Sequence, residues 1–440
     1  MNCYFTTFGC KVNTSETACM QAEFHKHGFK IVSDSEQADV IILNSCTVTS
    51  SGDSRSCNAL KKLRHENPDA VIVLTGCFPQ AFPEEAKAIP EADIVVGTKN
   101  RSEIIKLVED FINNNNRSYK HIEEYTGEEK FEVMSNPEFS GNTRAFIKIQ
   151  DGCNSFCTYC IIPYARGRCR SKPLSVLKTE LCEMSSKEYH EIVLCGINLA
   201  FYGMEWKGSL IDAILLACDT EGIERVRLGS LEPERITEDM LQVLSEQPKF
   251  CRQFHLSLQS GCDRTLKAMN RRYNTNEYME ICKRIRYYMP DCAITTDVMV
   301  GFPDETDDDF KETLKFIEKV QFANIHGFRY SPREGTKAAA MSNQVPEQIK
   351  SERMEMLKKC TKKMHIEFLK SHIGKIVSVL FERERGDGFH IGHAKDGTIV
   401  KVPMKNEKKS LRKSIFYVTI EKNDAVCCYG RIISDSNANS

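Results

Sequence analysis

Three cysteines in one short stretch have a spacing that suits metal chemistry. The stretch runs Asp151-Gly-Cys153-Asn-Ser-Phe-Cys157-Thr-Tyr-Cys160, a C-x-x-x-C-x-x-C pattern. Thiolates are the usual protein ligands of a 4Fe-4S cluster, and three of them leave the fourth iron without a protein ligand. An open position on a metal centre is where a substrate or cofactor can bind. The stretch therefore predicts a cluster that binds a small molecule.

Two simpler interpretations of these thiols stay open. A structural zinc site normally takes four protein ligands, and the nearest fourth candidate is Cys169, which lies beyond a Pro-Tyr-Ala-Arg-Gly turn. The thiols can also be three ordinary buried side chains. The ligand count favours the cluster over the zinc site.

A second set of cysteines follows strand-like runs near the N-terminus. Cys10, Cys46 and Cys77 come directly after the β-rich runs 3–8, 40–43 and 71–74. These runs alternate with helical stretches at 13–27, 50–65 and 83–88, which indicates a parallel sheet. The loops after parallel strands gather at one edge, where open α/β sheets bind ligands. We therefore expect the three thiols to converge and to hold a second cluster, the alternative being that each is a small buried apolar residue.

The central segment has the pattern of an open barrel. After a fourth strand (93–96), a helix (101–112) and a polar connector, six further strand-like runs alternate with helical ones: 145–149, 191–194, 225–228, 254–258, 293–300 and 324–328. In barrel enzymes the loops after the strands carry the chemistry, and the Cys153 loop follows the first of these strands. Later strand ends carry polar and glycine residues that can contact a bound cofactor, although turns favour the same residue types. These are Gly196, Asn198, Glu232, Gln259 and Asp297.

The last segment changes character. After a long charged helix (344–372), five short β-runs with turns between them lie between 376 and 433, a pattern that suits a small barrel of the oligonucleotide-binding type. A basic set there can follow a phosphate backbone, with Phe416 or Tyr417 available for base stacking; a solvated surface loop is the alternative. The set is Lys401, Lys405, Lys408, Lys409, Arg412 and Lys413.

The composition constrains the number of domains, the kind of partner and the cellular compartment. The chain has 440 residues, so two or three domains are expected, and its formal net charge of -1 gives no overall field that favours nucleic acid, DNA included. Twenty cysteines without a secretory signal favour metal ligation in a reducing compartment, which predicts a cytoplasmic protein. No apolar run approaches the length of a membrane span.

Taken together, these motifs resemble the methylthiotransferases of the radical S-adenosylmethionine (SAM) superfamily. The match covers nearly the whole chain and includes three cysteine motifs near the N-terminus, the Cys153 motif with its aromatic Tyr159, and the stretch 328–336. The N-terminal motifs are Thr7-Phe-Gly-Cys10-Lys-Val-Asn13, Asn44-Ser-Cys46-Thr-Val-Thr49 and Thr75-Gly-Cys77. The residues of these motifs are most similar to those of the branch that modifies N(6)-threonylcarbamoyladenosine next to the anticodon of tRNA.

The resemblance implies a three-part α/β architecture. An N-terminal methylthiotransferase domain with a parallel α/β sheet (1–116) would precede a partial (β/α)6 radical SAM barrel (139–371) and an RNA-binding TRAM domain, a small OB-like β-barrel (372–436).

The resemblance also implies the cofactors and the reaction. Cys153, Cys157 and Cys160 would hold the 4Fe-4S cluster that cleaves SAM, with Tyr159 and the five strand-end residues near SAM. Cys10, Cys46 and Cys77 would hold an auxiliary 4Fe-4S cluster whose open iron carries the sulfur to be donated. In this family one SAM methylates that sulfur, and a second supplies the radical that removes hydrogen from carbon-2 of the adenine ring.

Partners and alternatives follow from the same resemblance. It implies the tRNA anticodon stem-loop as substrate and an electron donor such as flavodoxin or ferredoxin. The alternatives are methylthiolation of isopentenyladenosine in tRNA or of a ribosomal protein side chain, and an iron-sulfur RNA-binding protein without turnover.

Overall fold

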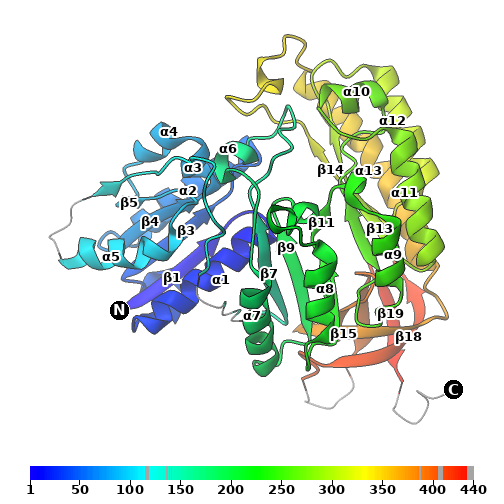
Figure 1. Ribbon diagram of the computed structural model, residues 1–440, viewed down its shortest axis with the longest axis horizontal. Helices are drawn as coiled ribbons and strands as arrows, with labels where there is room; N and C mark the ends of the chain where they lie inside the picture. Colours follow the sequence, from blue (N-terminus) through cyan, green and yellow to red (C-terminus); the bar gives the residue numbers. More distant parts are fainter. Residues whose placement is uncertain are drawn as a thin grey trace.

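The computed structural model describes residues 1–113, 118–134, 137, 139, 141–385, 388–404 and 410–433. Three units follow one another along the chain: a parallel sheet with helices on both faces, a half-barrel and a small closed β-barrel (Figure 1). This arrangement confirms the α/β fold class expected from the sequence. Among the described helices, none combines the length and the apolar sequence that crossing a bilayer requires.

The N-terminal unit is built on a parallel sheet with the strand order β2-β1-β3-β4-β5-β6. The expected strands are confirmed, but β2 and β6 were not predicted, because runs of three and two residues are too short to show a pattern. The strands are β1 (Asn2–Thr7), β2 (Lys30–Val32), β3 (Val40–Ser45), β4 (Val71–Gly76), β5 (Ile94–Val95) and β6 (Tyr119–Lys120).

Helices cover both faces of this sheet. The central strands β3 and β4 are buried along their whole length, as the continuous apolar sequence of a two-sided parallel strand requires. One core lies under α1 and α5, and the other lies under α2 and the short helices α3 and α4. The helices are α1 (Lys11–Lys26), α2 (Ser50–Glu66), α3 (Cys77–Ala81), α4 (Pro83–Lys87) and α5 (Ile104–Asn113).

The central unit contains the six strands expected for an open barrel. Together with the two-residue strands β8 and β11, which were not predicted, they form two four-stranded sheets, β10-β9-β7-β8 and β11-β12-β13-β14, in which only β8 runs antiparallel. A parallel bridge between Val226 and Phe250 links the two sheets. The strands are β7 (Arg144–Asp151), β8 (Arg170–Ser171), β9 (Glu191–Gly196), β10 (Arg225–Leu228), β11 (Ser230–Leu231), β12 (Gln253–Leu256), β13 (Ala293–Val300) and β14 (Asn324–Arg329).

Helices cover the outer face of the half-barrel. The apolar residues of the strands, such as Ile192, Val226 and Val298, share one core with these helices. The residues that alternate with them therefore face the inside of the half-barrel. The helices are α7 (Leu174–Ser186), α8 (Leu210–Asp219), α9 (Glu238–Ser245), α10 (Asp263–Ala268), α11 (Thr275–Tyr288) and α12 (Asp307–Val320). The short helix α6 (Ile162–Arg166) instead packs against α3 of the N-terminal unit.

The long helix α13 (Glu347–Lys370) packs against β14 and α12 and leads into the terminal barrel. The predicted five-stranded barrel is confirmed, with the closed order β15-β16-β17-β19-β18. Its strands are β15 (Ile376–Arg385), β16 (Phe389–Ala394), β17 (Ile399–Pro403), β18 (Ile415–Asn423) and β19 (Cys428–Ile432).

The terminal barrel closes the half-barrel at the end where the strands begin. Arg225, in the first position of β10, donates to the carbonyl of His393 (3.1 Å) and to the hydroxyl of Ser378 (2.8 Å). Arg227 donates to the carbonyl of Ala394 (3.2 Å). The strand ends that carry the predicted chemistry lie at the opposite end of the half-barrel.

Part of the basic set proposed for RNA has a structural role instead. Arg412 donates to the carbonyl of Gly141, and Lys413 donates to that of Lys187 (3.3 Å), so both anchor the terminal barrel to the central unit. Phe416 packs against the barrel core, whereas Tyr417 is exposed and remains available for stacking. Lys405, Lys408 and Lys409 lie outside the described residues.

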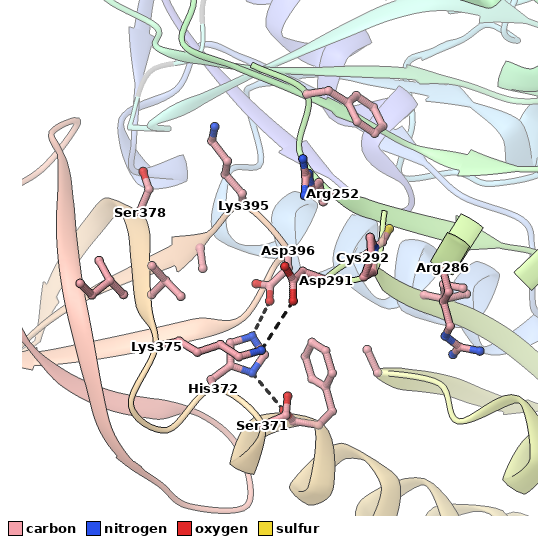
Figure 2. Close-up of a pocket in the computed structure, with 18 of the residues that line it drawn as sticks. Arg252, Arg286, Asp291, Cys292, Ser371, His372, Lys375, Ser378, Lys395 and Asp396 are labelled. Atoms are coloured by element: carbon pink, nitrogen blue, oxygen red, sulfur yellow. Dashed lines mark hydrogen bonds and ion pairs between the residues drawn. The ribbon is translucent and has the colours of Figure 1, made fainter. Parts of the chain in front are cut away.

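A cavity of about 740 Å³ lies where the half-barrel meets the terminal barrel (Figure 2). Its wall includes Arg252 and Cys292 from the half-barrel, His372 from the turn after α13, and Lys395 and Asp396 from the turn after β16. None of the residues predicted to do chemistry lines it. One contact in its wall, between His372 and Asp396 at 2.5 Å, joins the turn after α13 to the terminal barrel.

We expect His372→Ala to lower the free energy of unfolding by about 1–3 kcal/mol, since the imidazole makes a charged hydrogen bond. Burial alone would lower the pKa of His372, but the Asp396 carboxylate outweighs burial and raises it. The same contact lowers the pKa of Asp396 despite burial. The contact between His372 and Asp396 therefore contributes its full stabilisation between pH 3.8, the ordinary pKa of Asp396, and pH 6.5, the ordinary pKa of His372. This stabilisation declines as pH rises through the raised pKa of His372.

Urea unfolding of the wild type and of His372→Ala at pH 6 and pH 9 measures this contribution. The difference in the free energy of unfolding between the two proteins should be larger at pH 6 than at pH 9. Lys375→Ala is the control. Lys375 lies in the same wall, but its ion pair with Asp291, at 3.7 Å, is exposed and should contribute little to stability. An equal difference at both pH values would contradict the expected coupling.

Candidate functional site

The structure brings the N-terminal triad together. Cys10 directly precedes α1, Cys46 follows β3, and Cys77 is the first residue of α3. The strands β1, β3 and β4, which lead into these loops, are neighbours in the sheet. The loops touch, since a Cβ atom added to Gly9 would lie 2.8 Å from the Cβ of Cys46. The three thiols also interact electrostatically with one another.

Asn13 fixes the loops of this triad to each other. Its amide nitrogen donates to the carbonyls of Phe8 (2.8 Å) and Ser45 (2.9 Å), the ends of two neighbouring strands. Gly76, directly before Cys77, has φ +104, and a Cβ atom there would lie 2.5 Å from the carbonyl oxygen of Ser45. Only glycine fits so close to the next strand at this φ.

The second triad lies in the loop between β7 and α6. Cys153, Cys157 and Cys160 interact electrostatically with one another. The amide nitrogen of Asn198, after β9, lies 3.4 Å from the sulfur of Cys153. Cys169 also lies near Cys153, but it does not complete a single-metal site with the three thiols of the motif.

Arginines that the motifs did not single out as ligand partners contact one sulfur in each triad. Arg166 donates through Nε to the sulfur of Cys77 at 3.2 Å. Arg271 donates to the sulfur of Cys157 at 3.3 Å and forms an ion pair with Glu232. Burial raises the pKa of the Cys77 thiol to about 12, and the cation of Arg166 opposes this rise. Burial likewise raises the pKa of Cys157, and Arg271 opposes it.

A buried charge cluster lies between the two cysteine loops. Glu16 on α1 accepts hydrogen bonds from Arg101 (2.7 Å), Lys148 (2.8 Å) and Arg166. Burial alone would raise the pKa of Glu16, but these cations lower it to about 2. Asp151, next to the second triad, pairs with Lys148, Arg166 and Arg170. Arg166 and Arg170 thus form ion pairs with acidic neighbours.

Three of the residues predicted to bind SAM lie around the second triad. Asn198 contacts Cys153, Glu232 pairs with the arginine on Cys157, and Tyr159 packs its ring edge-on against Phe302. Burial raises the pKa of the Glu232 carboxyl, and Arg271 opposes this. Gly196 ends β9, where a Cβ atom would lie 2.8 Å from Gln150.

Of the other two predicted residues, Asp297 lies on β13 and Gln259 lies three residues after the end of β12. Gln259 has φ +67, and its side-chain oxygen is buried without a hydrogen-bond partner among the described residues, as is that of Asn198. Buried acceptors of this kind suit a ligand that donates hydrogen bonds. Asp297 lies further down its strand and is held between His255 (3.2 Å) and His326 (3.3 Å). Burial alone would raise the pKa of Asp297, but the two imidazoles lower it well below its usual range.

Polar side chains continue across the inner face of the half-barrel. Arg227 bridges Glu191 on β9 (2.8 Å) and Gln253 on β12. His255, two residues after Gln253, faces Asp297, and Asp297 faces His326 on β14. The His326 side chain is 76% exposed, so the row opens toward solvent at its last member. The inner surface is therefore polar and charged along this row.

The stretch after β14 docks the half-barrel on the N-terminal unit, which the sequence did not predict. Arg333 donates to the hydroxyl of Thr47 (2.7 Å), directly after Cys46, and to the carboxylate of Asp53 (2.5 Å). Its guanidinium lies 4.6 Å from the centre of the Phe82 ring. The hydroxyls of Ser331 and Ser50 are 3.0 Å apart. The last strand of the half-barrel is thus tied to the N-terminal triad.

We expect Arg333→Ala to destabilise the protein by about 2–4 kcal/mol, because it leaves the partly buried Asp53 carboxylate without its cation. Thermal or urea unfolding measures the loss. Arg329→Ala is the control: Arg329 is the last residue of β14, four residues before Arg333, and its ion pair with Glu347, at 3.5 Å, is exposed. Exposed pairs contribute about 0–1 kcal/mol. Equal stability of the two variants would rule out the docking role of Arg333.

No three His, Cys, Asp or Glu side chains of the described residues are arranged to hold a single metal ion. A 4Fe-4S cluster differs, since each thiolate binds its own iron and the sulfurs do not converge on one point. Both triads offer sulfur donors only, three each, from loops that face one another through α3 and α6 (Figure 1). Two all-sulfur sites with three ligands each fit two such clusters.

Known proteins share this organisation. Residues 2–97 match a family described as "Uncharacterized protein family UPF0004", and residues 147–317 match the "Radical SAM superfamily". A curated protein of Thermotoga maritima, "Threonylcarbamoyladenosine tRNA methylthiotransferase MtaB", is 41% identical over 377 residues, covering 86% of this chain and 85% of the relative.

The chain belongs to the radical SAM methylthiotransferase family.

Other members of the family are also similar. A "tRNA-2-methylthio-N(6)-dimethylallyladenosine synthase" of Clostridium tetani is 37% identical over 390 residues, covering 87% of this chain and 85% of the relative. Among solved structures, the radical SAM methyltransferase TsrM of Kitasatospora setae matches with a TM-score of 0.57 at 10% identity, over 77% of this chain and 74% of that one, which supports the shared fold. The expected family and enzyme class are confirmed.

Proposed function

We propose that the protein adds a methylthio group to carbon-2 of N(6)-threonylcarbamoyladenosine next to the anticodon of tRNA. The observation that carries this proposal is the pairing of two three-cysteine sites, joined through Arg166, within a radical SAM fold. A transferase that both activates SAM and donates sulfur needs two such centres close together. Of the comparisons, the Thermotoga maritima relative is named for this substrate.

The residues divide between two tasks. Cys153, Cys157 and Cys160 would hold the cluster that binds SAM, and Cys10, Cys46 and Cys77 would hold the auxiliary cluster. When bound, these clusters supply the electron that cleaves SAM and the site that carries the donated sulfur. Asn198 and Gln259 offer buried acceptors toward SAM, and Arg271 orients Cys157 while Glu232 holds Arg271.

The inner face of the half-barrel favours threonylcarbamoyl over dimethylallyl as the group on the adenine. A threonylcarbamoyl group carries a carboxylate, a hydroxyl and amide groups, and all of these need polar partners. The part of the row that opens toward solvent provides charged side chains on the inner face, namely His255, Asp297 and His326. A dimethylallyl group has no polar atoms to place against this charged surface, so its contact would remove water from these side chains without a new hydrogen bond in return.

Three domains would share the work. We assign residues 1–116 to the auxiliary cluster, 139–371 to SAM activation, and 372–436 to RNA binding in a TRAM domain. The partners would be the tRNA anticodon stem-loop and an electron donor such as flavodoxin or ferredoxin, in the cytoplasm and without contact to DNA or membrane. The exposed ring of Tyr417 supports an RNA contact on the terminal barrel.

One incubation separates the candidate functions. Reconstituted protein is mixed with SAM, dithionite and tRNA carrying either threonylcarbamoyladenosine or isopentenyladenosine, and the nucleosides are analysed by mass spectrometry. The proposal expects a methylthio product from the first tRNA only. A product from the second tRNA, or a modified ribosomal protein in a parallel incubation, would replace it with the corresponding alternative. Absence of 5′-deoxyadenosine would leave an iron-sulfur RNA-binding protein.

A further inference from the structure

The buried charges between the two cysteine loops are unbalanced. Four cations, Arg101, Lys148, Arg166 and Arg170, surround two carboxylates, Glu16 and Asp151. All six side chains are buried. The group therefore has a surplus of two positive charges, and little water is present to screen them.

Arg166 brings this surplus to the N-terminal triad. Its Nε donates to the sulfur of Cys77, and its two terminal nitrogens donate to Glu16 and, at 2.8 Å, to Asn13. Three directed contacts fix the guanidinium, and Asn13 is the residue that joins the loops of Cys10 and Cys46. Arg166 also ends α6, a few residues after Cys160, so one short segment serves both triads.

The charges beside the second triad are balanced. Arg271 donates to the sulfur of Cys157, but its charge is matched by the carboxylate of Glu232 in the same contact set. A donor hydrogen bond and a positive charge both favour the state of a cluster that carries one more electron. The N-terminal triad receives a hydrogen bond from an arginine whose buried group has surplus positive charge, while the second triad receives a hydrogen bond from an arginine in a neutral pair.

We infer that Arg166 is a positioning residue that raises the reduction potential of the auxiliary cluster above that of the SAM-binding cluster. The inference rests on the proposed function, since it requires Cys10, Cys46 and Cys77 to be cluster ligands. Each cluster accepts one electron from an external reductant, and the auxiliary cluster accepts its electron at the less negative potential. The cluster that must reduce SAM thereby keeps the more strongly reducing couple.

The test uses full-length, anaerobically reconstituted protein titrated with dithionite and followed by electron paramagnetic resonance. Cys153, Cys157 and Cys160 are replaced by alanine in the background, so that only the auxiliary cluster contributes. In that background Arg166→Gln should shift the midpoint potential to more negative values and change the signal shape. Arg166→Lys, which keeps the charge, should recover most of the shift.

Two further variants make the result decisive. Glu16→Gln removes a carboxylate that does not touch a cysteine, and it should shift the potential in the opposite direction, to less negative values. Arg168→Gln is the matched control on the same segment, because Arg168 lies over the ring of Phe156 and forms no ion pair with the described residues; it should leave the potential unchanged.

The outcomes separate this inference from the proposed function. If Arg166→Gln cannot hold the cluster, the opposite shift of Glu16→Gln still tests the charge effect. Equal potentials in the background protein, Arg166→Gln and Glu16→Gln would overturn the inference. Absence of any cluster in the background protein would instead remove the N-terminal triad as a ligand set, and the proposed function with it.

Discussion

Cys160→Ala is expected to reduce the formation of 5′-deoxyadenosine from SAM to background. Loss of an outer partner of a metal site already costs about 10–100-fold, and the loss of one of only three protein ligands should cost more. The neighbours of Cys160 within the triad, Cys153 and Cys157, lie in the same loop and interact with it electrostatically. Iron bound at the N-terminal triad should remain.

The measurement is 5′-deoxyadenosine by mass spectrometry after incubation of reconstituted protein with SAM and dithionite, together with iron content. Cys169→Ala is the matched control, because Cys169 also lies near Cys153 but is not part of the motif. We expect Cys169→Ala to keep both iron and SAM cleavage. Loss of the metal in both variants would indicate a four-cysteine site, as the zinc alternative requires.

Local sequence patterns were enough to predict the fold and both triads. Continuous apolar runs such as Val40–Ser45 and Val71–Gly76 form the central strands, and the topology of a parallel sheet then brings Cys10, Cys46 and Cys77 to one edge. The C-x-x-x-C-x-x-C spacing needed no long-range information at all. Site residues in the loops after strands are predictable, because the apolar pattern of each strand indicates where its loop begins.

The residues that support the triads were not predictable in the same way. Arg271 reaches Cys157, and Arg333 reaches Thr47, from distant parts of the chain. Nothing near either arginine in sequence indicates its partner, since an arginine between polar residues usually faces solvent. Asp297 differs from both arginines: its place on a strand predicts a cofactor contact, which stays a prediction, while its histidine partners on neighbouring strands were not predicted.

The short strand β6 and the interdomain anchors were missed for a related reason. β6 joins the sheet through pairing with β5 alone, and a pairing partner is not visible in a short charged sequence. Arg412 and Lys413 resemble an RNA-binding patch in sequence, but they donate to carbonyls of the central unit. A basic cluster has the same composition whether it meets phosphates or backbone carbonyls, and only the packing of the units distinguishes the two.

Cys77→Ala is expected to abolish methylthiolation while SAM cleavage continues. Cys77 is buried, and no other cysteine of the described N-terminal unit takes the equivalent place after β4. Bound iron should fall by about half, because one of two four-iron sites is lost. The Nε of Arg166 also loses its acceptor, which should cost about 1–3 kcal/mol of stability.

Iron content, 5′-deoxyadenosine and methylthio-nucleoside in tRNA are measured on the same preparation. Cys57→Ala is the matched control, because Cys57 lies within α2 and packs against the apolar core of the same unit; it should keep the iron and the product. Full iron content in Cys77→Ala would exclude the N-terminal triad as a cluster site. Loss of SAM cleavage together with the product would mean that the two sites do not act separately, because Arg166 and the loop that carries it would then transmit the damage to Cys153, Cys157 and Cys160.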